Sequence, residues 1–443
     1  MSAAADKFSR LAALKPSRPM PARSAAIRTP GEDDTLGRLL GAGVATNHFG
    51  EHLAVRNWFS TPEFTDPSST TLELLSRTRD ESLSRKTLAT LKDPEKWLFL
   101  DTETTGLAGG TGTYAFLIGL AWWDAGGLQV EQFFMRDFGE EHSLLQELSQ
   151  RVAERPVLVT FNGKSFDWPL LESRYTMTRS IAVPKLAAHL DLLHPARALW
   201  KLRLGSVRLV ELERHVLDAP RVGWHRENDV SSAQIPQFYF DYLRGGPAEP
   251  LAGVVRHNQM DLRGLAALFG KMNEILSEAP NATNAIESLD LFGLSRFLQR
   301  RGKDDRADSA CAKALSMGLP AEFRPKARRD LAQMAKRRGE HARAAEVWLE
   351  IVADAHDGIH ACEQLAIHYE HNAKDFCRAT EFAQLALAKL RRQRGSSRDP
   401  HLAAQCERLE KRFLHRLARL QHQIETTGGL VSLLALSRSS GES

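Results

Sequence analysis

The sequence predicts an α/β domain, a mixed sheet flanked by helices, followed by an all-α repeat domain. Apolar runs of strand length recur between residues 96 and 162, and two of them end in polar residues, which predicts the first part. Ala-rich and Arg-rich helical segments repeat after Pro280, which predicts the second. A chain of 443 residues is also too long for one ordinary core, so more than one domain is expected.

The N-terminal part of the chain carries no recognisable chemistry. Residues 1–34 are rich in Ala, Ser, Pro and Arg without periodicity, so we expect a disordered arm. Residues 35–95 form an extension of unclear fold, in which TLELLSRT (71–78) has an apolar helical register. We expect this extension to pack on the α/β domain, which is placed at residues 96–275.

Strands open the α/β domain. KWLFLDTET (96–104) is a short apolar run that ends in acidic and hydroxyl residues, as a buried strand with a functional end does. YAFLIGLAWWD (114–124) and LQVEQFFMR (128–136) are strand-like and joined by a glycine-containing connection, which predicts a hairpin. A helical segment (140–154) leads into another buried strand, PVLVTFN (156–162), and helices dominate the rest of the domain.

Repeats are predicted at residues 285–427, followed by a tail at 428–443. Three segments align on a small residue that recurs in each: Ala307, Ala344 and Ala379. The spacing is close to the period of about 34 residues of a helix-turn-helix repeat, and Gly302 and Gly339 occupy turns. A short tetratricopeptide-like solenoid fits this period. An irregular helical bundle is the alternative, because the consensus aromatic positions are only partly filled.

Composition excludes several classes of protein. Hydrophobic residues make up 42% and charged residues 26%, which are ordinary globular values. The apolar stretch 114–123 is about half the length that crosses a bilayer, so no membrane partner is expected. The N-terminus lacks the apolar segment of a secretory signal and the four cysteines form no CxxC, which favours reduced thiols and a cytoplasmic location. The net charge of +4 does not by itself indicate a nucleic-acid binder.

Two acidic residues at the end of the first strand suggest a cation site. Asp101 and Glu103 stand two apart on one strand, so both carboxylates project from one face, where their repulsion is costly unless a cation lies between them. The full motif DTETTGL (101–107) is more specific than a lone acidic pair. The alternative is a pair of exposed strand-end acids before a Thr-Gly turn.

A second motif, FNGKSFDWPLL (161–171), places Asp167 near the start of a helix. The alternative role of Asp167 is a helix N-cap, because the Trp-Pro pair that follows suits a first helical turn. Asn162 and Lys164 are candidates for contacts with phosphates, and an ordinary surface lysine is an equally good interpretation of Lys164.

The third motif is HNQMDLRGLAAL (257–268). His257 and Asp261 are four residues apart on a predicted helix and therefore share a face, although an isolated histidine of this kind is usually structural. With the two earlier motifs, four carboxylates are available to ligate two hard cations, as phosphodiester hydrolysis requires. His257 would orient or deprotonate the water. Of two further acids, Asp191 is interpreted as a structural strand-end acid, and Asp229 as one with a smaller chance of approaching the site.

These motifs resemble those of a known family. DTETTGL, FNGKSFDWPLL and HNQMD are similar to the three motifs of the DEDD 3′→5′ exonucleases, and residues 97–271 resemble the YprB-type RNase H-like domain of bacteria, which is often joined to tetratricopeptide repeats. The resemblance implies an RNase H-like fold, a site for two Mg²⁺ or Mn²⁺ ions, and binding of a nucleic-acid strand end. It places Thr104 and Leu107 at the substrate, although a buried turn leucine is the simpler explanation of Leu107.

One departure from the family concerns the histidine. The histidine branch of these exonucleases has its histidine five residues before the last aspartate, whereas His257 stands four before Asp261, the spacing of the tyrosine branch. The four predicted metal ligands are unaffected. The identity of the group that orients the water is left open.

The leading prediction is a 3′→5′ exonuclease that acts on DNA or RNA. Repeats of this kind more often recruit a protein partner than bind nucleic acid directly, and the sequence does not specify their role here. One alternative is a structure-selective endonuclease, since fold does not settle function. The other is a non-catalytic nucleic-acid or protein scaffold, and the complete carboxylate set argues against the scaffold only. The basic runs RPKARR (324–329) and KRR (336–338) are either phosphate contacts or, at least as well, solvated helix faces. No spacing in the sequence distinguishes a DNA substrate from an RNA substrate.

Overall fold

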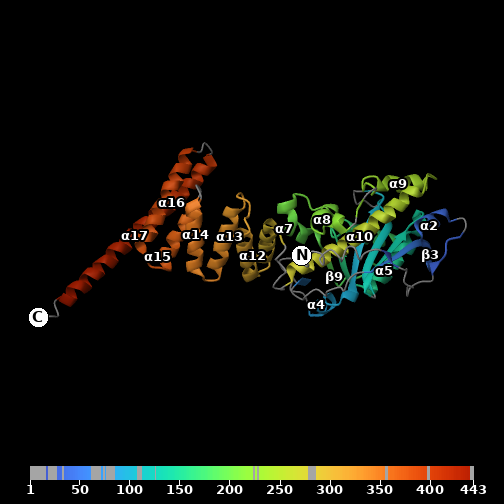
Figure 1. The fold of residues 1–443 in the computed structure, drawn as a ribbon, viewed down its shortest axis with the longest axis horizontal. Helices are drawn as coiled ribbons and strands as arrows, with labels where there is room; N and C mark the ends of the chain where they lie inside the picture. The colour runs from blue at the N-terminus through green and yellow to red at the C-terminus, as the bar shows by residue number, and fades with distance from the viewer. Residues whose placement is uncertain are drawn as a thin grey trace. The chain divides into compact units, whose positions relative to one another are not determined.

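The computed structural model divides into two compact units, 1–286 and 287–443, and each is described by itself (Figure 1). The residues that the structure describes are 16–17, 27–31, 34–60, 71–72, 75, 85–106, 112–124, 126–222, 225–226, 229–277, 286–354, 358–396 and 400–439. Within these ranges, we find no helix with the length and hydropathy that a membrane span needs.

The first unit is built on one mixed sheet. Its strands are β1 (Pro16–Ser17), β2 (Ile27–Arg28), β3 (Gly43–Asn47), β4 (Gly50–Ser60), β5 (Trp97–Thr104), β6 (Ala115–Asp124), β7 (Gly127–Phe134), β8 (Val157–Thr160) and β9 (Ala188–Asp191). They lie in the order β2-β3-β4-β7-β6-β5-β8-β9, with β1 paired to β4. The pairs β5–β8 and β8–β9 are parallel and the others antiparallel, so β5 and β8 end at the same edge of the sheet.

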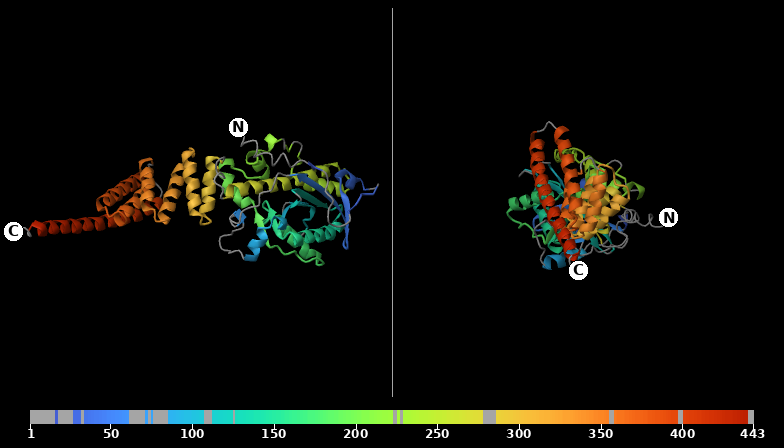
Figure 2. Two further views of the ribbon diagram at one scale, coloured as in Figure 1. Left: turned by 60° about the horizontal axis from the view of Figure 1, so that its bottom comes forward. Right: turned by 90° about the vertical axis from the view of Figure 1, so that its left-hand side faces the viewer.

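Helices cover both faces of this sheet (Figure 2). They are α2 (Thr35–Leu40), α4 (Arg85–Leu91), α5 (Glu141–Glu154), α6 (Asp167–Thr178), α7 (Leu193–Leu204), α8 (Leu209–His215), α9 (Ile235–Leu243) and α10 (Glu249–Leu276). Neighbouring residues of β7 point to opposite faces, and Gln132 donates to the Val255 carbonyl of α10, whereas Glu131 pairs with Arg151 of α5. Helices α5 and α10 therefore lie on opposite faces. This is the predicted α/β class, with the expected β6–β7 hairpin.

The N-terminal residues extend the sheet. Of the arm expected to be disordered, residues 16–17 pair with β4 and residues 27–28 pair with β3. In the extension, β4 pairs along its length with β7. The edge of a sheet leaves backbone groups unpaired, so added strands satisfy them whatever their composition. Of the predicted helical segment 71–78, only Thr71, Leu72 and Leu75 are described, and all three are helical.

The second unit is entirely helical. Its helices are α11 (Ser288–Gln299), α12 (Asp304–Ser316), α13 (Arg324–Arg337), α14 (His341–Asp354), α15 (Ile359–His371), α16 (Phe376–Ser396) and α17 (Pro400–Ser439). Each helix packs on the next one in the chain, and the aligned small residues Ala307, Ala344 and Ala379 are buried. The helical class is as predicted, and tetratricopeptide identity stays a prediction. Helix α17 continues to Ser439 through most of the expected tail.

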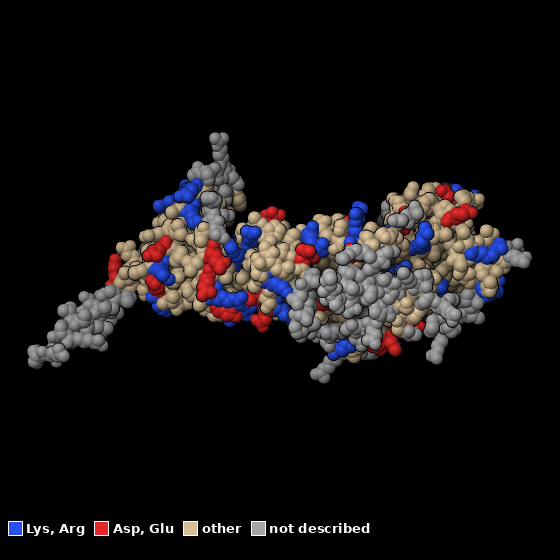
Figure 3. All heavy atoms as spheres, in the orientation of Figure 1, with Lys and Arg blue, Asp and Glu red and all other residues tan. Residues whose placement is uncertain are grey.

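The basic runs of the second unit lie among acidic partners. In Figure 3, Lys and Arg side chains of this unit are interspersed with Asp and Glu. Arg338 of the run 336–338 contacts Asp308 and Glu340, and Arg328 lies 3.6 Å from Glu350. These contacts give the two arginines acidic partners within the helical unit.

Candidate active site

The site is built on the alternation of side chains along β5. Trp97 and Phe99 pack against Phe269 of α10, with ring centroids 5.0 and 6.0 Å apart. Asp101 and Glu103 continue the same face of the strand, so the packing of its apolar half directs its acidic half toward α10. The register of β5 on β6 shifts between Glu103 and Thr104, a bulge of the kind that re-aims side chains beside active sites.

Asp167 reaches the same strand from α6. It is the first residue of that helix, and the preceding residue makes no side-chain cap. Its Oδ1 accepts hydrogen bonds from the backbone N–H of Thr102 at 3.1 Å and from the Thr102 hydroxyl at 2.6 Å. The carboxylate therefore holds the end of β5, and the N-cap residue of α6 is Phe166 rather than Asp167. The parallel pairing of β5 and β8 brings this helix start to the acidic strand end.

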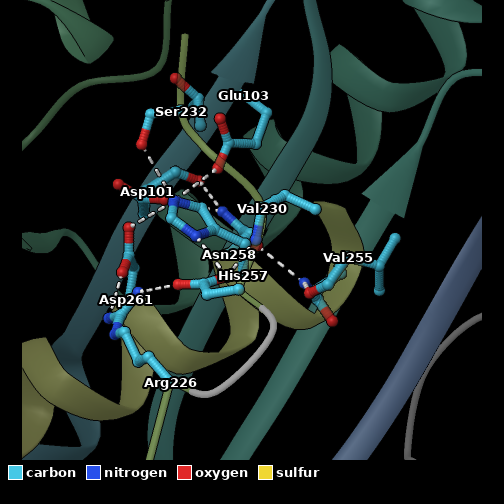
Figure 4. A network of polar contacts seen from close by, with 12 residues as sticks. Asp101, Glu103, Arg226, Val230, Ser232, Val255, His257, Asn258 and Asp261 are labelled. Carbon is cyan, nitrogen blue, oxygen red and sulfur yellow. Dashed lines mark hydrogen bonds and ion pairs between the residues drawn. The ribbon is translucent and has the colours of Figure 1, made fainter. Parts of the chain in front are cut away.

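The third motif lies on α10 and faces the strand (Figure 4). His257 and Asp261 are one helical turn apart, and His257 Nε2 lies 3.5 Å from Asp261 Oδ2 and 4.0 Å from Glu103 Oε1. The histidine is buried. Helical spacing thus places the imidazole beside the carboxylates, as the shared face of the motif predicted.

A buried amide that sequence reasoning missed fixes Asp101. Asn258 donates from Nδ2 to Asp101 Oδ2 at 2.8 Å and accepts at Oδ1 from Gln132 at 2.8 Å. Gly119 is paired with Asp101 on one side and with Gln132 on the other, and an added Cβ there would lie 2.0 Å from Asn258 Oδ1. A glycine is therefore required at position 119. The only sequence signal for Asn258 was a polar residue directly after His257.

An arginine and a second aspartate complete the network. Arg226 donates to both carboxylate oxygens of Glu213, to Asp229 Oδ2 at 3.0 Å and to Asp261 Oδ1. Asp229 Oδ1 lies 2.8 Å from His257 Nδ1. Asp229 thus approaches the site, the less favoured of the outcomes expected from sequence. Arg226 had no sequence signal, because it lies in an irregular segment with no motif around it.

The electrostatics of the cluster are unfavourable without a cation. Burial is the main cause that raises the pKa of Asp101, and the nearby charge of Asp261 adds to it. The pKa of Glu103 is raised for the same two reasons. Burial also raises the pKa of Asp167. Buried carboxylates that repel one another in this way are stabilised by a cation among them.

The donor set fits hard divalent cations by its chemistry, since every candidate ligand is a carboxylate oxygen. Among the described residues, no three His, Cys, Asp or Glu side chains are already gathered closely enough to hold an ion. The carboxylates of Glu103, Asp167 and Asp261 all lie near enough to Asp101 for their charges to raise its pKa.

The predicted substrate residues have different surroundings. Thr104 donates its hydroxyl to the Gly106 carbonyl at 2.8 Å, and Leu107 lies outside the described residues. Asn162 has a positive φ of 70° and donates its backbone N–H to Asp191 Oδ1 at 2.8 Å. Asp191 also accepts the backbone N–H groups of two other residues, so it is a structural acid, as predicted.

Lys164 stands three residues before Asp167, is exposed, and lines a cavity of about 760 Å³. The other lining residues come from α6 and from the segment that ends in β9: Trp168, Pro169, Glu172, Val183, Pro184, Lys185, Leu186 and His189. The lining thus combines two lysines with one glutamate, aliphatic side chains and the buried indole of Trp168.

Comparisons with known proteins identify the family of this chain. Residues 98–273 match the model of the RNase_H superfamily. The chain is similar to the uncharacterized protein YprB of Bacillus subtilis (strain 168), with 32% identity over 297 residues, which cover 66% of this chain and 68% of that protein. A solved family B DNA polymerase from Pyrobaculum calidifontis matches with a TM-score of 0.31 and 13% identity, over 47% of this chain and 30% of the polymerase. At that score the similarity does not establish a common fold.

Proposed function

The chain belongs to the RNase H superfamily, as a relative of YprB, and on this premise we propose that it is a metal-dependent 3′→5′ exonuclease acting on DNA or RNA. One observation carries the proposal. Asp101 and Glu103 at the end of β5, Asp167 at the start of α6, and His257 and Asp261 on α10 converge at one edge of the sheet. The polarity follows from the resemblance of the three motifs to DEDD exonucleases.

In this mechanism the carboxylates of Asp101, Glu103, Asp167 and Asp261 would hold two divalent cations, Mg²⁺ or Mn²⁺. Bound cations supply Lewis acidity, which activates an attacking water and stabilises the leaving oxygen. His257 accepts the proton of the attacking water at Nε2, the ring nitrogen that faces the carboxylates. Asn258 holds Asp101 in place through its hydrogen bond to Oδ2.

The substrate strand is expected to contact the exposed surface beside Asp167. Lys164 and Lys185 line the cavity described above and supply positive charge for phosphates. The first unit is otherwise slightly acidic, with 32 Lys and Arg against 34 Asp and Glu over residues 1–286, so local rather than bulk charge has to attract the strand. A partner-binding role of the helical unit and a cytoplasmic location remain predictions.

The test follows nucleotide release from 3′-labelled and 5′-labelled single-stranded DNA and RNA with Mg²⁺, Mn²⁺ or EDTA. The native chain is compared with Asp101→Asn, and Asp124→Asn, the same change at an exposed position of β6, is the matched control. Stepwise, metal-dependent shortening from the 3′ end that is lost only in Asp101→Asn supports the proposal. Internal cuts would establish an endonuclease instead, and binding without cleavage would establish a scaffold.

A further inference from the structure

His257 is held from the side that faces away from the carboxylates. Its Nδ1 lies 2.8 Å from Oδ1 of Asp229, which enters from the segment before α9. Its Nε2 faces Glu103 and Asp261, as described above, and lies 3.4 Å from the Ser232 hydroxyl (Figure 4). The two ring nitrogens therefore have different partners, one a close carboxylate and the other a ring of more distant oxygens.

These contacts select a tautomer. An ionised carboxylate only accepts hydrogen bonds, so Nδ1 must carry the proton that Asp229 accepts. Nε2 is then the nitrogen free to take a proton. Its distances to Glu103 and Asp261, 4.0 and 3.5 Å, are too long for direct hydrogen bonds and suit a water between the groups. The geometry around Nε2 is that of a base beside a water site.

Arg226 connects Asp229, the partner of His257 Nδ1, to the candidate metal ligand Asp261. It spans Glu213, Asp229 and Asp261 with donors on one planar guanidinium, and its side chain is 10% exposed. Burial acts to lower the pKa of Arg226, but its contacts with Glu213 and Asp261 outweigh burial and raise it, so the group stays charged. A planar fork of this kind fixes direction as well as charge.

The guanidinium of Arg226 is itself fixed relative to α10, through Glu213. Glu213 of α8 accepts two hydrogen bonds from Arg226 at 2.6 and 2.7 Å. An added Cβ at Gly264 would lie 2.1 Å from Glu213 Oε1, so the carboxylate packs directly on the α10 backbone one turn after Asp261. Helix α10, which carries His257 and Asp261, thus also packs against Glu213, the residue that accepts the two hydrogen bonds from Arg226.

We propose that Asp229 and Arg226 are positioning residues of the nuclease reaction. Asp229 fixes the His257 tautomer with Nε2 toward the water site, and Arg226 links Asp229 to Asp261 so that base and metal ligand keep a common geometry. This inference rests on the proposed function. It also accounts for a histidine four residues before Asp261, the spacing of the tyrosine branch. Asp229, which contacts Nδ1, comes from a separate segment, so this contact does not depend on the spacing within the motif.

The first test reads the tautomer directly and does not require activity. In protein labelled with ¹⁵N-histidine, the His257 signals are assigned by their loss in His257→Gln and observed with and without Mg²⁺. We expect the Mg²⁺-loaded native chain to carry the proton on Nδ1, and Asp229→Asn to lose this preference. A proton on Nε2 of the Mg²⁺-loaded native protein would overturn the inference, whether or not the chain proves to be a nuclease.

The second test separates positioning from folding. Since general-base catalysis contributes at least about 100-fold, Asp229→Asn should lower kcat by about 100-fold while KM and the Mn²⁺ dissociation constant change less than about threefold. Arg226→Gln should in addition weaken Mn²⁺ binding about tenfold, because Asp261 loses its partner. Asp241→Asn, the same change on the solvent-exposed side of α9, is the control. If near-UV circular dichroism shows that both proteins are folded and the kcat of Asp229→Asn lies within threefold of that of the control, the proposal is wrong.

Discussion

Replacing Gly119 by alanine tests the close packing beneath Asp101. The new Cβ would lie 2.0 Å from Oδ1 and 2.8 Å from Cγ of Asn258, and contacts under 3.0 Å force a displacement. Asn258 is fully buried and cannot move without loss of its hydrogen bonds to Gln132 and Asp101, both 2.8 Å long. Overpacking costs about 1–3 kcal/mol, and each lost hydrogen bond about 1 kcal/mol. We expect Gly119→Ala to lower the free energy of unfolding of the first unit by about 3–5 kcal/mol.

The assay is urea unfolding followed by tryptophan fluorescence. Seven of the eight tryptophans lie in the first unit, so the signal reports that unit. The control is Gly270→Ala in α10, where an added Cβ meets nothing within 4 Å and alanine favours the helix by up to about 1 kcal/mol.

A second background identifies the cause. In Asn258→Ala the obstructing amide is absent, so adding Gly119→Ala should cost less than about 1 kcal/mol. If Gly119→Ala is as costly in this background as in the native chain, the clash with Asn258 is not the reason for the glycine. A native-like stability of Gly119→Ala alone would refute the packing argument altogether.

Three further predictions concern charge. Burial lowers the pKa of His52 to about 4 from 6.5, so its contribution is complete above pH 6.5 and is lost as the pH falls toward 4; His52→Gln should reduce the acid destabilisation between pH 7 and 4.5 by about 2 kcal/mol, measured from urea midpoints. Because burial raises the pKa values of Asp101 and Glu103, Mn²⁺ binding should release protons and tighten with pH, and calorimetric heats that do not vary with the buffer would contradict this. Lys185→Ala should weaken binding of single-stranded nucleic acid and lower its salt slope by about 0.7, by fluorescence anisotropy, whereas exposed Lys201→Ala should not.

Local patterns predicted the parts of the molecule that depend on local chemistry. The apolar run 97–100 before Asp101 identified a buried strand with a polar end, and strand 157–160 was found in the same way. The spacing of His257 and Asp261 placed both on one helix face, and the structure brings that face to β5. The hydrophobic period of an element and the position of a residue within it depend on residues close in sequence, so both can be recognised before the fold is known.

Contacts between distant segments could not be predicted in this way. Asn258 meets Asp101 across 157 positions of sequence, and the glycine that makes room for it looks like any other glycine in a strand. Arg226 lies outside every periodic segment, and two of its three carboxylate partners, Glu213 and Asp261, stand 13 and 35 positions away. The first strands were missed because their pairing depends on an open sheet edge rather than on their own composition.

The alternation of side chains along β5 also limits the insertions and deletions that this strand can tolerate. One residue inserted between Phe99 and Asp101 would turn every later side chain of the strand to the opposite face, and the acids would point away from α10. Two inserted residues would restore the faces but slide the acids along the parallel pairing with β8. Insertions and deletions should therefore be absent from this strand among working relatives, while substitutions at Leu98 or Leu100 that preserve volume are tolerated.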